Sequence, residues 1–114
     1  MQKKYTPKPP RAKNIKKTSW DSVASWYDTL FNDPQSYQRQ VILPNLLRLL
    51  DIKKGMRMID IACGQGFFTN EFARSGAHIT GTDIAPELIA IAKKNSTEKE
   101  TRFIVSPADT LSFV

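Results

Sequence analysis

The chain has 114 residues, with 17 Lys and Arg against 11 Asp and Glu and a formal net charge of +6. This length fits one domain, and a single Cys63 and a single His78 exclude an internal disulfide and a zinc site built from Cys and His. No apolar run approaches the roughly 18 residues of a membrane span, and the basic N-terminus is not followed by the apolar stretch of a signal peptide. We therefore expect a cytoplasmic protein that makes no contact with a membrane.

The positive charge is concentrated in residues 1–18, which hold seven Lys and Arg and no acidic residue. The remaining chain is nearly neutral, with ten basic and eleven acidic residues. Because Pro7, Pro9 and Pro10 lie among few apolar side chains, this segment predicts a flexible tail. It is either a solvated extension or a salt-sensitive contact with RNA, the ribosome or another polyanion. Tyr5 is its only aromatic ring, which favours the first interpretation.

Residues 19–52 have the spacing of amphipathic helices. Behind a Ser19 cap, the apolar residues of the first helix are Trp20, Val23, Ala24, Tyr27, Leu30 and Phe31. Asn32–Pro34 predicts a break, and a second apolar face follows that is kinked or restarted at Pro44. Trp20 and Trp26 are interpreted as core residues, whereas for Tyr27 a core position and a ligand contact remain equally open.

Residues 53–114 alternate between strand and helix patterns after a turn at 53–55. The predicted elements are a buried strand over 56–61, a helix over 67–75, a strand over 77–83, a helix from Pro86 and a strand over 102–105. This order predicts an α/β fold with a parallel sheet. We expect the first βαβαβ half of a Rossmann-like domain over 53–114, preceded by the helical segment.

Gly64, Gly66 and Asp83 follow the first two predicted strands. In an open parallel sheet, ligands bind beyond the carboxyl ends of the strands, and glycines there allow backbone to approach a ligand. Asp83 comes 19 residues after Gly64, at a distance that suits a carboxylate binding ribose hydroxyls. The pattern predicts a site for an adenosine-type cofactor. Thr69 stands where a dinucleotide fingerprint requires its third glycine, which disfavours a pyrophosphate cofactor.

Four segments in order resemble the motifs of class I S-adenosylmethionine-dependent methyltransferases, in the small-molecule branch similar to ubiquinone and menaquinone biosynthesis enzymes. They are the entry helix 20–28, the glycine turn 60–66, the second motif 81–89 and the third motif 108–113. The resemblance covers about residues 19–114. It implies a Rossmann-like fold, S-adenosylmethionine as the cofactor and methyl transfer to a small-molecule acceptor.

The resemblance also implies roles for individual residues. The cofactor-binding residues that it implies are Tyr27, Asp60, Ala62, Cys63, Gly64, Gly66, Asp83, Ile84, Ala108 and Asp109. Ala62 and Gly64 would contact the aminoacyl end of the cofactor, Asp83 the ribose and Ile84 the adenine, while Tyr27 would cover the cofactor.

Two of these implied roles have alternatives. Asp60 would orient the turn near the cofactor ammonium, or it would be a structural acceptor for N–H groups of the loop. Pro107 stands where many relatives have Asp or Asn to bind the adenine amino group. Asp109 or the backbone at Ala108 would substitute for that residue.

In-line methyl displacement depends mainly on positioning, and the sequence identifies no catalytic acid or base. Cys63 is interpreted as a small buried residue and His78 as an ordinary strand residue.

The resemblance implies a sheet with the strand order 3-2-1-4-5, of which these residues would form only strands 3, 2 and 1. Strand 1 would then have an open edge through which the chain would associate. We expect a fragment of a longer methyltransferase or a truncated reading frame. The alternatives are a fragment that binds a nucleoside or docks on a partner without catalysis, and a dinucleotide oxidoreductase, which Thr69 disfavours.

Overall fold

The computed structural model describes residues 20–111, so the basic segment 1–18, the Ser19 cap, and Ser112 and Phe113 of the third motif lie outside the described residues. The described elements are the 3-10 helix η1 (Asp21–Val23), α1 (Ala24–Asn32), the π-helix η2 (Gln38–Ile42), α2 (Leu43–Leu50), β1 (Arg57–Ile61), α3 (Phe67–Ala73), β2 (His78–Asp83), α4 (Pro86–Asn95) and β3 (Thr101–Val105). The predicted alternation of strands and helices is confirmed.

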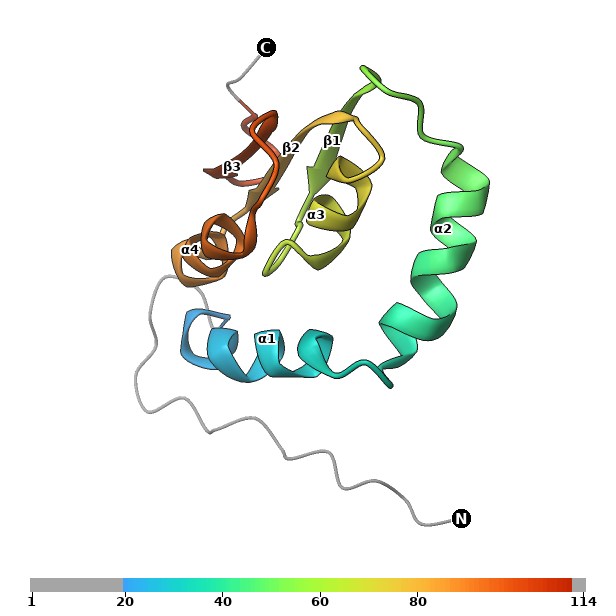
Figure 1. Cartoon of the computed structure of the whole chain (residues 1–114). Helices are drawn as coiled ribbons and strands as arrows, with labels where there is room; N and C mark the ends of the chain where they lie inside the picture. Colours follow the sequence, from blue (N-terminus) through green and yellow to red (C-terminus); the bar gives the residue numbers. More distant parts are fainter. Residues whose placement is uncertain (1–19, 112–114) are drawn as a thin grey trace, which may run out of the picture.

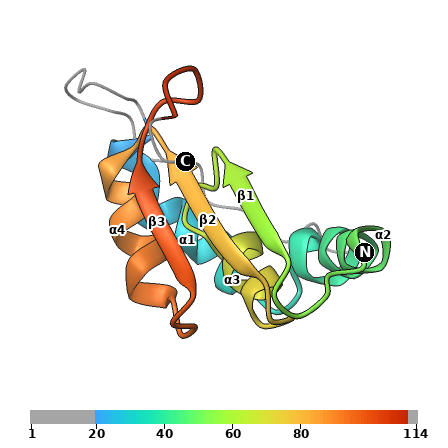
Figure 2. The same cartoon turned by 90° about the horizontal axis from the view of Figure 1, so that it is seen from above.

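The three strands form one parallel sheet in the order β1-β2-β3. Arg57 of β1 pairs with His78, and Ile79 of β2 pairs with Thr101. Helices α1, α3 and α4 lie on the same side of this sheet (Figures 1 and 2). The arrangement is a partial Rossmann-like fold. Because the strands are parallel, the carboxyl ends of β1, β2 and β3 lie at the same end of the sheet.

Strand β1 lies at an edge of the described sheet and is less buried than its sequence predicted. Ile59 and Ile61 keep 45% and 46% of their surface exposed, whereas Met58 packs into the cluster formed by α2, α3 and β2. Alternate side chains of a strand point to opposite faces, and the described helices cover only one of them. The prediction of a buried strand is therefore wrong for the other face of β1.

The N-terminal segment forms the predicted helices, with two differences. The first helix begins as the turn η1 before α1, and Trp20 is 48% exposed, so its interpretation as a core residue is wrong. The break after Asn32 is confirmed. The second helix begins as the π-helix η2 and continues as α2 with Pro44 in its first turn, where a missing N–H costs little.

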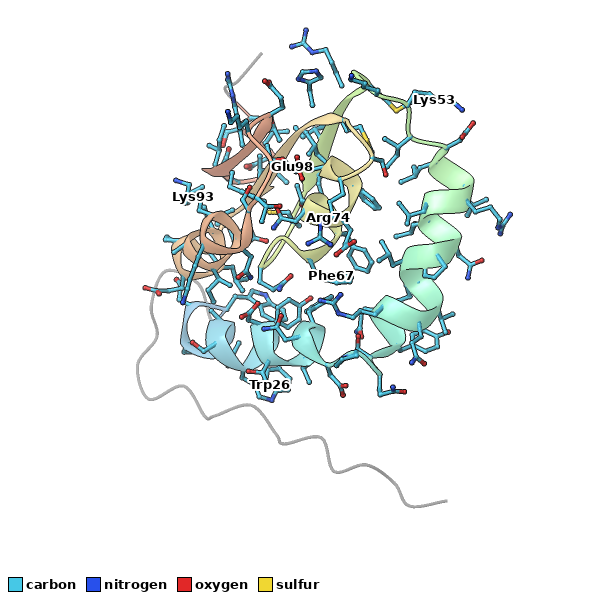
Figure 3. All side chains as sticks on the ribbon, viewed as in Figure 1. Trp26, Lys53, Phe67, Arg74, Lys93 and Glu98 are labelled. Atoms are coloured by element: carbon cyan, nitrogen blue, oxygen red, sulfur yellow. The ribbon has the colours of Figure 1, made fainter. Side chains whose placement is uncertain are left out.

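Six aromatic rings form a continuous row between α1 and α3, with neighbouring centroids 4.9 to 6.2 Å apart. The aromatic row consists of Trp20, Tyr27, Phe31, Phe67, Phe68 and Phe72. Phe67 lies between α1 and α3, whereas Trp26 lies on the outer side of α1 (Figure 3). Such ring pairs add about 0.5–1.5 kcal/mol each beyond the area that they bury. The row therefore holds α1 against the glycine turn at the start of α3.

Helix α1 is also attached to α4. Asp21 Oδ1 accepts a hydrogen bond from the backbone N–H of Glu87 at 3.1 Å, which satisfies a donor in the first turn of α4. Ala24 is buried against Ala85 and Leu88. These contacts set the entry helix beside the carboxyl end of β2, where Asp83 lies.

Candidate functional site

The glycine turn follows β1 and runs from Ala62 to Gly66, with a left-handed backbone conformation at three of its residues. The φ angles are +60° at Ala62, +61° at Gly64 and +82° at Gly66. Glycine adopts such angles without strain, whereas Ala62 does so at a cost of about 1 kcal/mol or more. A Cβ on Gly66 would lie 2.7 Å from Ala92 Cβ and 3.0 Å from the Phe103 ring, so α4 and β3 can approach the turn only because glycine is there.

Asp83 ends β2 and connects its loop to the glycine turn. The residue is only 9% exposed. Asp83 Oδ2 accepts a hydrogen bond from the Gly64 N–H at 2.9 Å, and Oδ1 accepts one from the Ala85 N–H at 2.9 Å. Each carboxylate oxygen has two lone pairs, so both oxygens keep acceptor capacity for a ligand.

Asp60 near the end of β1 and Cys63 within the turn are both partly buried. Asp60 Oδ2 accepts a hydrogen bond from the Thr69 hydroxyl at 2.7 Å, while the turn N–H of Gly64 goes to Asp83. Burial raises the pKa of Asp60. The hydrogen bond from the Thr69 hydroxyl lowers this pKa in part, and the negative charge of Asp83 raises it further. Burial, followed by the charges of Asp60 and Asp83, raises the pKa of Cys63 to about 12. Cys63 is therefore a neutral thiol at physiological pH, not an activated nucleophile.

Tyr27 covers the glycine turn from α1. Its Cε1 atom lies 3.2 Å from the place that a Cβ on Gly64 would occupy. Burial raises the pKa of the Tyr27 phenol, and the nearby charge of Asp83 raises it further. The tyrosine thus remains protonated and presents an aromatic face and a neutral hydroxyl to the site.

These groups surround a pocket of about 520 Å³ at the carboxyl ends of the strands. This volume lies within the range of about 300–1,000 Å³ typical of small-molecule sites. Seven of the ten residues predicted from the sequence line the pocket, namely Tyr27, Ala62, Gly64, Asp83, Ile84, Ala108 and Asp109. The other three, Asp60, Cys63 and Gly66, are not among the lining residues.

The sequence analysis did not assign four of the lining residues to the site: Trp20, Leu88, Ser106 and Pro107. Trp20 precedes Tyr27 by seven residues, which is two helical turns, so its spacing could have indicated the shared face. Its ring meets that of Tyr27 edge to face, with centroids 5.5 Å apart. Pro107 lies in the wall where the third motif was expected to recognise adenine.

Within residues 20–111, no group of three His, Cys, Asp or Glu side chains is arranged to hold a metal ion. Among the described helices, none combines the length and the apolar character that crossing a bilayer requires. The groups that line the pocket are the backbone turn, the carboxylates and the aromatic wall.

A glycine turn after the first parallel strand and a carboxylate at the end of the second define an α/β domain of the nucleotide-binding type. A family model described as "Methyltransferase domain" matches residues 52–112, which is more than half of the chain. The chain belongs to this family, as a partial domain of the class I S-adenosylmethionine-dependent type. The motif resemblance seen in the sequence is thereby confirmed.

Individual relatives agree with this family. A ubiquinone biosynthesis O-methyltransferase of Xylella fastidiosa is 35% identical over 92 residues, which cover 76% of this chain and 37% of the relative. The chain thus spans little more than a third of that protein's length. A TehB-like methyltransferase of Corynebacterium glutamicum has the same fold, with a TM-score of 0.62 at 24% identity over 78% of this chain and 48% of that one. A methyltransferase of Geobacter sulfurreducens in complex with S-adenosylhomocysteine matches with a TM-score of 0.53 at 28% identity, over 56% of this chain and 28% of that one.

Proposed function

We propose that this chain binds S-adenosylmethionine in the pocket at the ends of β1, β2 and β3 and takes part in methyl transfer to a small-molecule acceptor. The observation that carries the proposal is the Gly64–Asp83 hydrogen bond, because it brings the first two motifs together at one wall of the pocket. The family match and the relative with bound S-adenosylhomocysteine support the same cofactor.

The chemistry of the pocket residues fits this cofactor. Asp83 has acceptor capacity for the two ribose hydroxyls, and Ile84, 45% exposed at the pocket wall, offers an apolar surface to adenine. Gly64 carries no side chain, so the aminoacyl end can approach the turn. Tyr27 and Trp20 form an aromatic wall of the pocket.

When bound, the cofactor would supply a sulfonium methyl group for in-line transfer, in which a substrate nucleophile bonds to the methyl carbon and the carbon–sulfur bond breaks to leave a neutral thioether. The contribution of this chain is to hold the reactants in line and to exclude water. Correct orientation of two reactants can supply several orders of magnitude in rate, and a neutral thiol at Cys63 takes no part in the transfer. Because the Xylella relative is named as an O-methyltransferase, we propose a hydroxyl group on a small molecule as the acceptor.

A second candidate function is cofactor binding without turnover. Tyr27, Asp83 and Asp109 are the ionisable residues lining the pocket in the part of the chain that the structure describes. Asp83 is engaged with two backbone N–H groups, and the pKa of Tyr27 is raised. This set offers no histidine or lysine to accept a proton from a substrate hydroxyl, which favours a role in holding the cofactor.

Calorimetry with S-adenosylhomocysteine and with NAD tests the binding proposal. We expect the first to bind and the second not to, because buried Thr69 stands where a dinucleotide site needs glycine. Asp83→Ala should lose most of the affinity, and equal affinity in this variant would remove Asp83 from the site. Transfer of label from methyl-labelled cofactor into a metabolite extract separates the two candidate functions, since a binding fragment yields no labelled product.

A further inference from the structure

Gln65 is a buried amide in the glycine turn that the proposed cofactor contacts do not use. It is 3% exposed and is not among the residues lining the pocket. Its Nε2 donates a hydrogen bond to Asp28 Oδ1 at 2.8 Å, and its Oε1 accepts one from the Phe67 N–H at 2.5 Å. One side chain therefore connects the entry helix α1 to the first residue of α3.

Asp28, the partner of Gln65, is held in place by two further donors. Asn95 at the end of α4 donates to Asp28 Oδ1 at 3.1 Å, and Asn32 donates to Oδ2 at 3.2 Å. Since Asp28 follows Tyr27 directly on α1, its position sets the position of the Tyr27 ring over Gly64.

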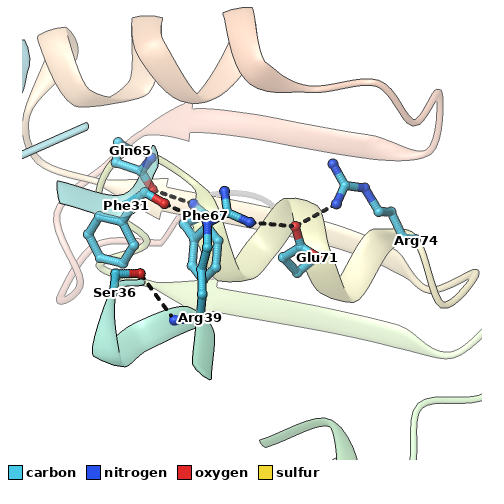
Figure 4. A network of polar contacts seen from close by, with 7 residues as sticks. All are labelled: Phe31, Ser36, Arg39, Gln65, Phe67, Glu71 and Arg74. Atoms are coloured by element: carbon cyan, nitrogen blue, oxygen red, sulfur yellow. Dashed lines mark hydrogen bonds and ion pairs between the residues drawn. The ribbon is translucent and has the colours of Figure 1, made fainter. Parts of the chain in front are cut away.

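A separate contact fixes the far end of α1. Arg39 Nε donates to the Phe31 carbonyl at 2.7 Å, its guanidinium lies 4.6 Å from the centroid of the Phe67 ring, and Glu71 is 4.0 Å away (Figure 4). The other end of the segment is attached to α4 through Asp21. Between these two attachments, the polar side chain of Gln65 connects α1 to the glycine turn.

We propose that Gln65 is a positioning residue, whose hydrogen bond to Asp28 holds Tyr27 and Trp20 over the pocket and thereby slows release of the cofactor. The inference rests on the proposed cofactor site. A buried hydrogen bond to a carboxylate belongs to the stronger class, because the acceptor is charged and water is excluded. Its loss weakens the attachment of α1 to the turn, which then depends on the aromatic row, while Asp83 and the glycine turn keep their own hydrogen bond.

The test exchanges the donor and the acceptor of the hydrogen bond between Gln65 and Asp28. In Gln65→Glu, the side chain can still accept from Phe67 but faces the Asp28 carboxylate with a second negative charge. In the double variant Gln65→Glu with Asp28→Asn, an amide again donates to a carboxylate across the same contact, and the exposed Asn95 amide, which donates to Asp28 Oδ1 in the original chain, has to turn its oxygen toward the new NH₂ group. Gln40→Glu is the matched control, because it adds the same charge at an exposed glutamine whose side chain bonds Gln35 and the Pro34 carbonyl on the surface.

The measurements are the dissociation constant for S-adenosylhomocysteine, its release rate and the melting temperature, all on the full 114-residue chain. We expect Gln65→Glu to weaken binding about 10- to 100-fold, mainly through faster release. The double variant should recover binding to within about threefold of the original chain. Gln40→Glu should bind like the original. If Gln65→Glu does not fold, Gln65→Met removes the donor to Asp28 together with the acceptor of the Phe67 N–H, without adding charge, and should also release the ligand faster.

The outcomes separate the inference from the function on which it rests. If the original chain does not bind S-adenosylhomocysteine, the proposed function is overturned, and the inference with it. Binding by the original chain with an unchanged release rate in Gln65→Glu or Gln65→Met would overturn the inference alone. Weak binding in Gln65→Glu that the double variant does not restore would show that the residue acts through general stability, which also contradicts a positioning role.

Discussion

The backbone N–H of Gly64 donates a hydrogen bond to Asp83 Oδ2 at 2.9 Å, across 19 residues of sequence. The same carboxylate holds the Ala85 N–H through its other oxygen. The turn after β1 and the turn after β2 are therefore one hydrogen-bonded unit before any ligand is considered. A side chain predicted to bind ribose also determines the shape of the pocket.

Asp83→Asn tests this double role. An amide offers one acceptor oxygen where the carboxylate offers two, so one of the two backbone N–H groups would face an NH₂ group. We expect the variant to lose about 1–3 kcal/mol in the free energy of unfolding, measured by urea denaturation, together with much of its cofactor affinity. Asp109→Asn is the control, because it removes the same charge from an exposed residue in the pocket wall and should not change folding. Equal stability of the two variants would contradict the structural role.

Gly66→Ala tests the close packing behind the turn. Gly66 and Gly55 have nearly the same φ, +82° and +81°, but only Gly66 has neighbours within 4 Å of an added Cβ. Both alanine variants bear a backbone cost of about 1–2 kcal/mol. Gly66→Ala should lose a further ~1–3 kcal/mol from crowding against Ala92 and Phe103, and thermal or urea unfolding measures the difference. Similar losses in both variants would show that α4 and β3 can move aside.

Arg39→Lys tests the junction between α1 and α3. Lysine cannot reproduce both the bond to the Phe31 carbonyl and the planar contact with the Phe67 ring. We expect a loss of about 1–2 kcal/mol in unfolding free energy. Arg48→Lys, at an exposed arginine that bonds only Asn45 among the contacts described, should change stability by less than about 0.5 kcal/mol. If Arg39→Lys does not change stability, the aromatic row and the Gln65–Asp28 bond hold the two helices together without the Arg39 contacts.

The sequence predicted the alternation of strands and helices and the glycine turn because both depend on short-range patterns, whereas the order of the strands in the sheet was implied by the family resemblance. Apolar runs that end at Gly64 or Asp83 specify parallel strands, and Pro86 opens α4 where expected. The acid at the end of β2 was found because its distance from the turn follows from the length of the intervening helix and strand. These features are local, so one sequence is enough to indicate them.

Features that depend on long-range contacts were missed. Trp20 was interpreted as a core residue, but it lines the pocket because Asp21 caps α4 from 66 residues away and fixes η1 there. The exposure of Ile59 could not be read from its apolar neighbours, because burial of a strand face depends on which elements cover it. The Gln65–Asp28 bond likewise joins residues 37 apart and leaves no periodic pattern.

Asp60→Asn tests the electrostatics beside the turn. Burial raises the pKa of Asp60 above its ordinary value of 3.8, so the folded chain holds this proton more tightly than the unfolded chain does. The charged carboxylate therefore costs stability at pH 7, and the cost disappears as pH falls below about 3.8. We expect Asp60→Asn to be more stable than the original at pH 7, with a difference that shrinks on acidification, as measured by denaturation at several pH values.

Thr69→Val supplies the complementary variant for Asp60. It removes the hydroxyl that stabilises the carboxylate, so the pKa of Asp60 should rise further and the pH dependence should become steeper. Equal stability of the original chain and Asp60→Asn at every pH would contradict a raised pKa.

The last prediction concerns strand β1. An open strand edge beside exposed apolar side chains favours association between chains. Ile59 is 45% exposed at the middle of β1, and we expect the 114-residue chain to self-associate through this strand. Ile59→Lys should weaken association about tenfold or more in sedimentation velocity, since a lysine at the edge must be desolvated on pairing. Leu49→Lys makes a comparable change on α2, where Leu49 is 68% exposed, and should leave association unchanged. A chain that stays monomeric at all concentrations, or an equal effect of both variants, would rule out β1 as the contact.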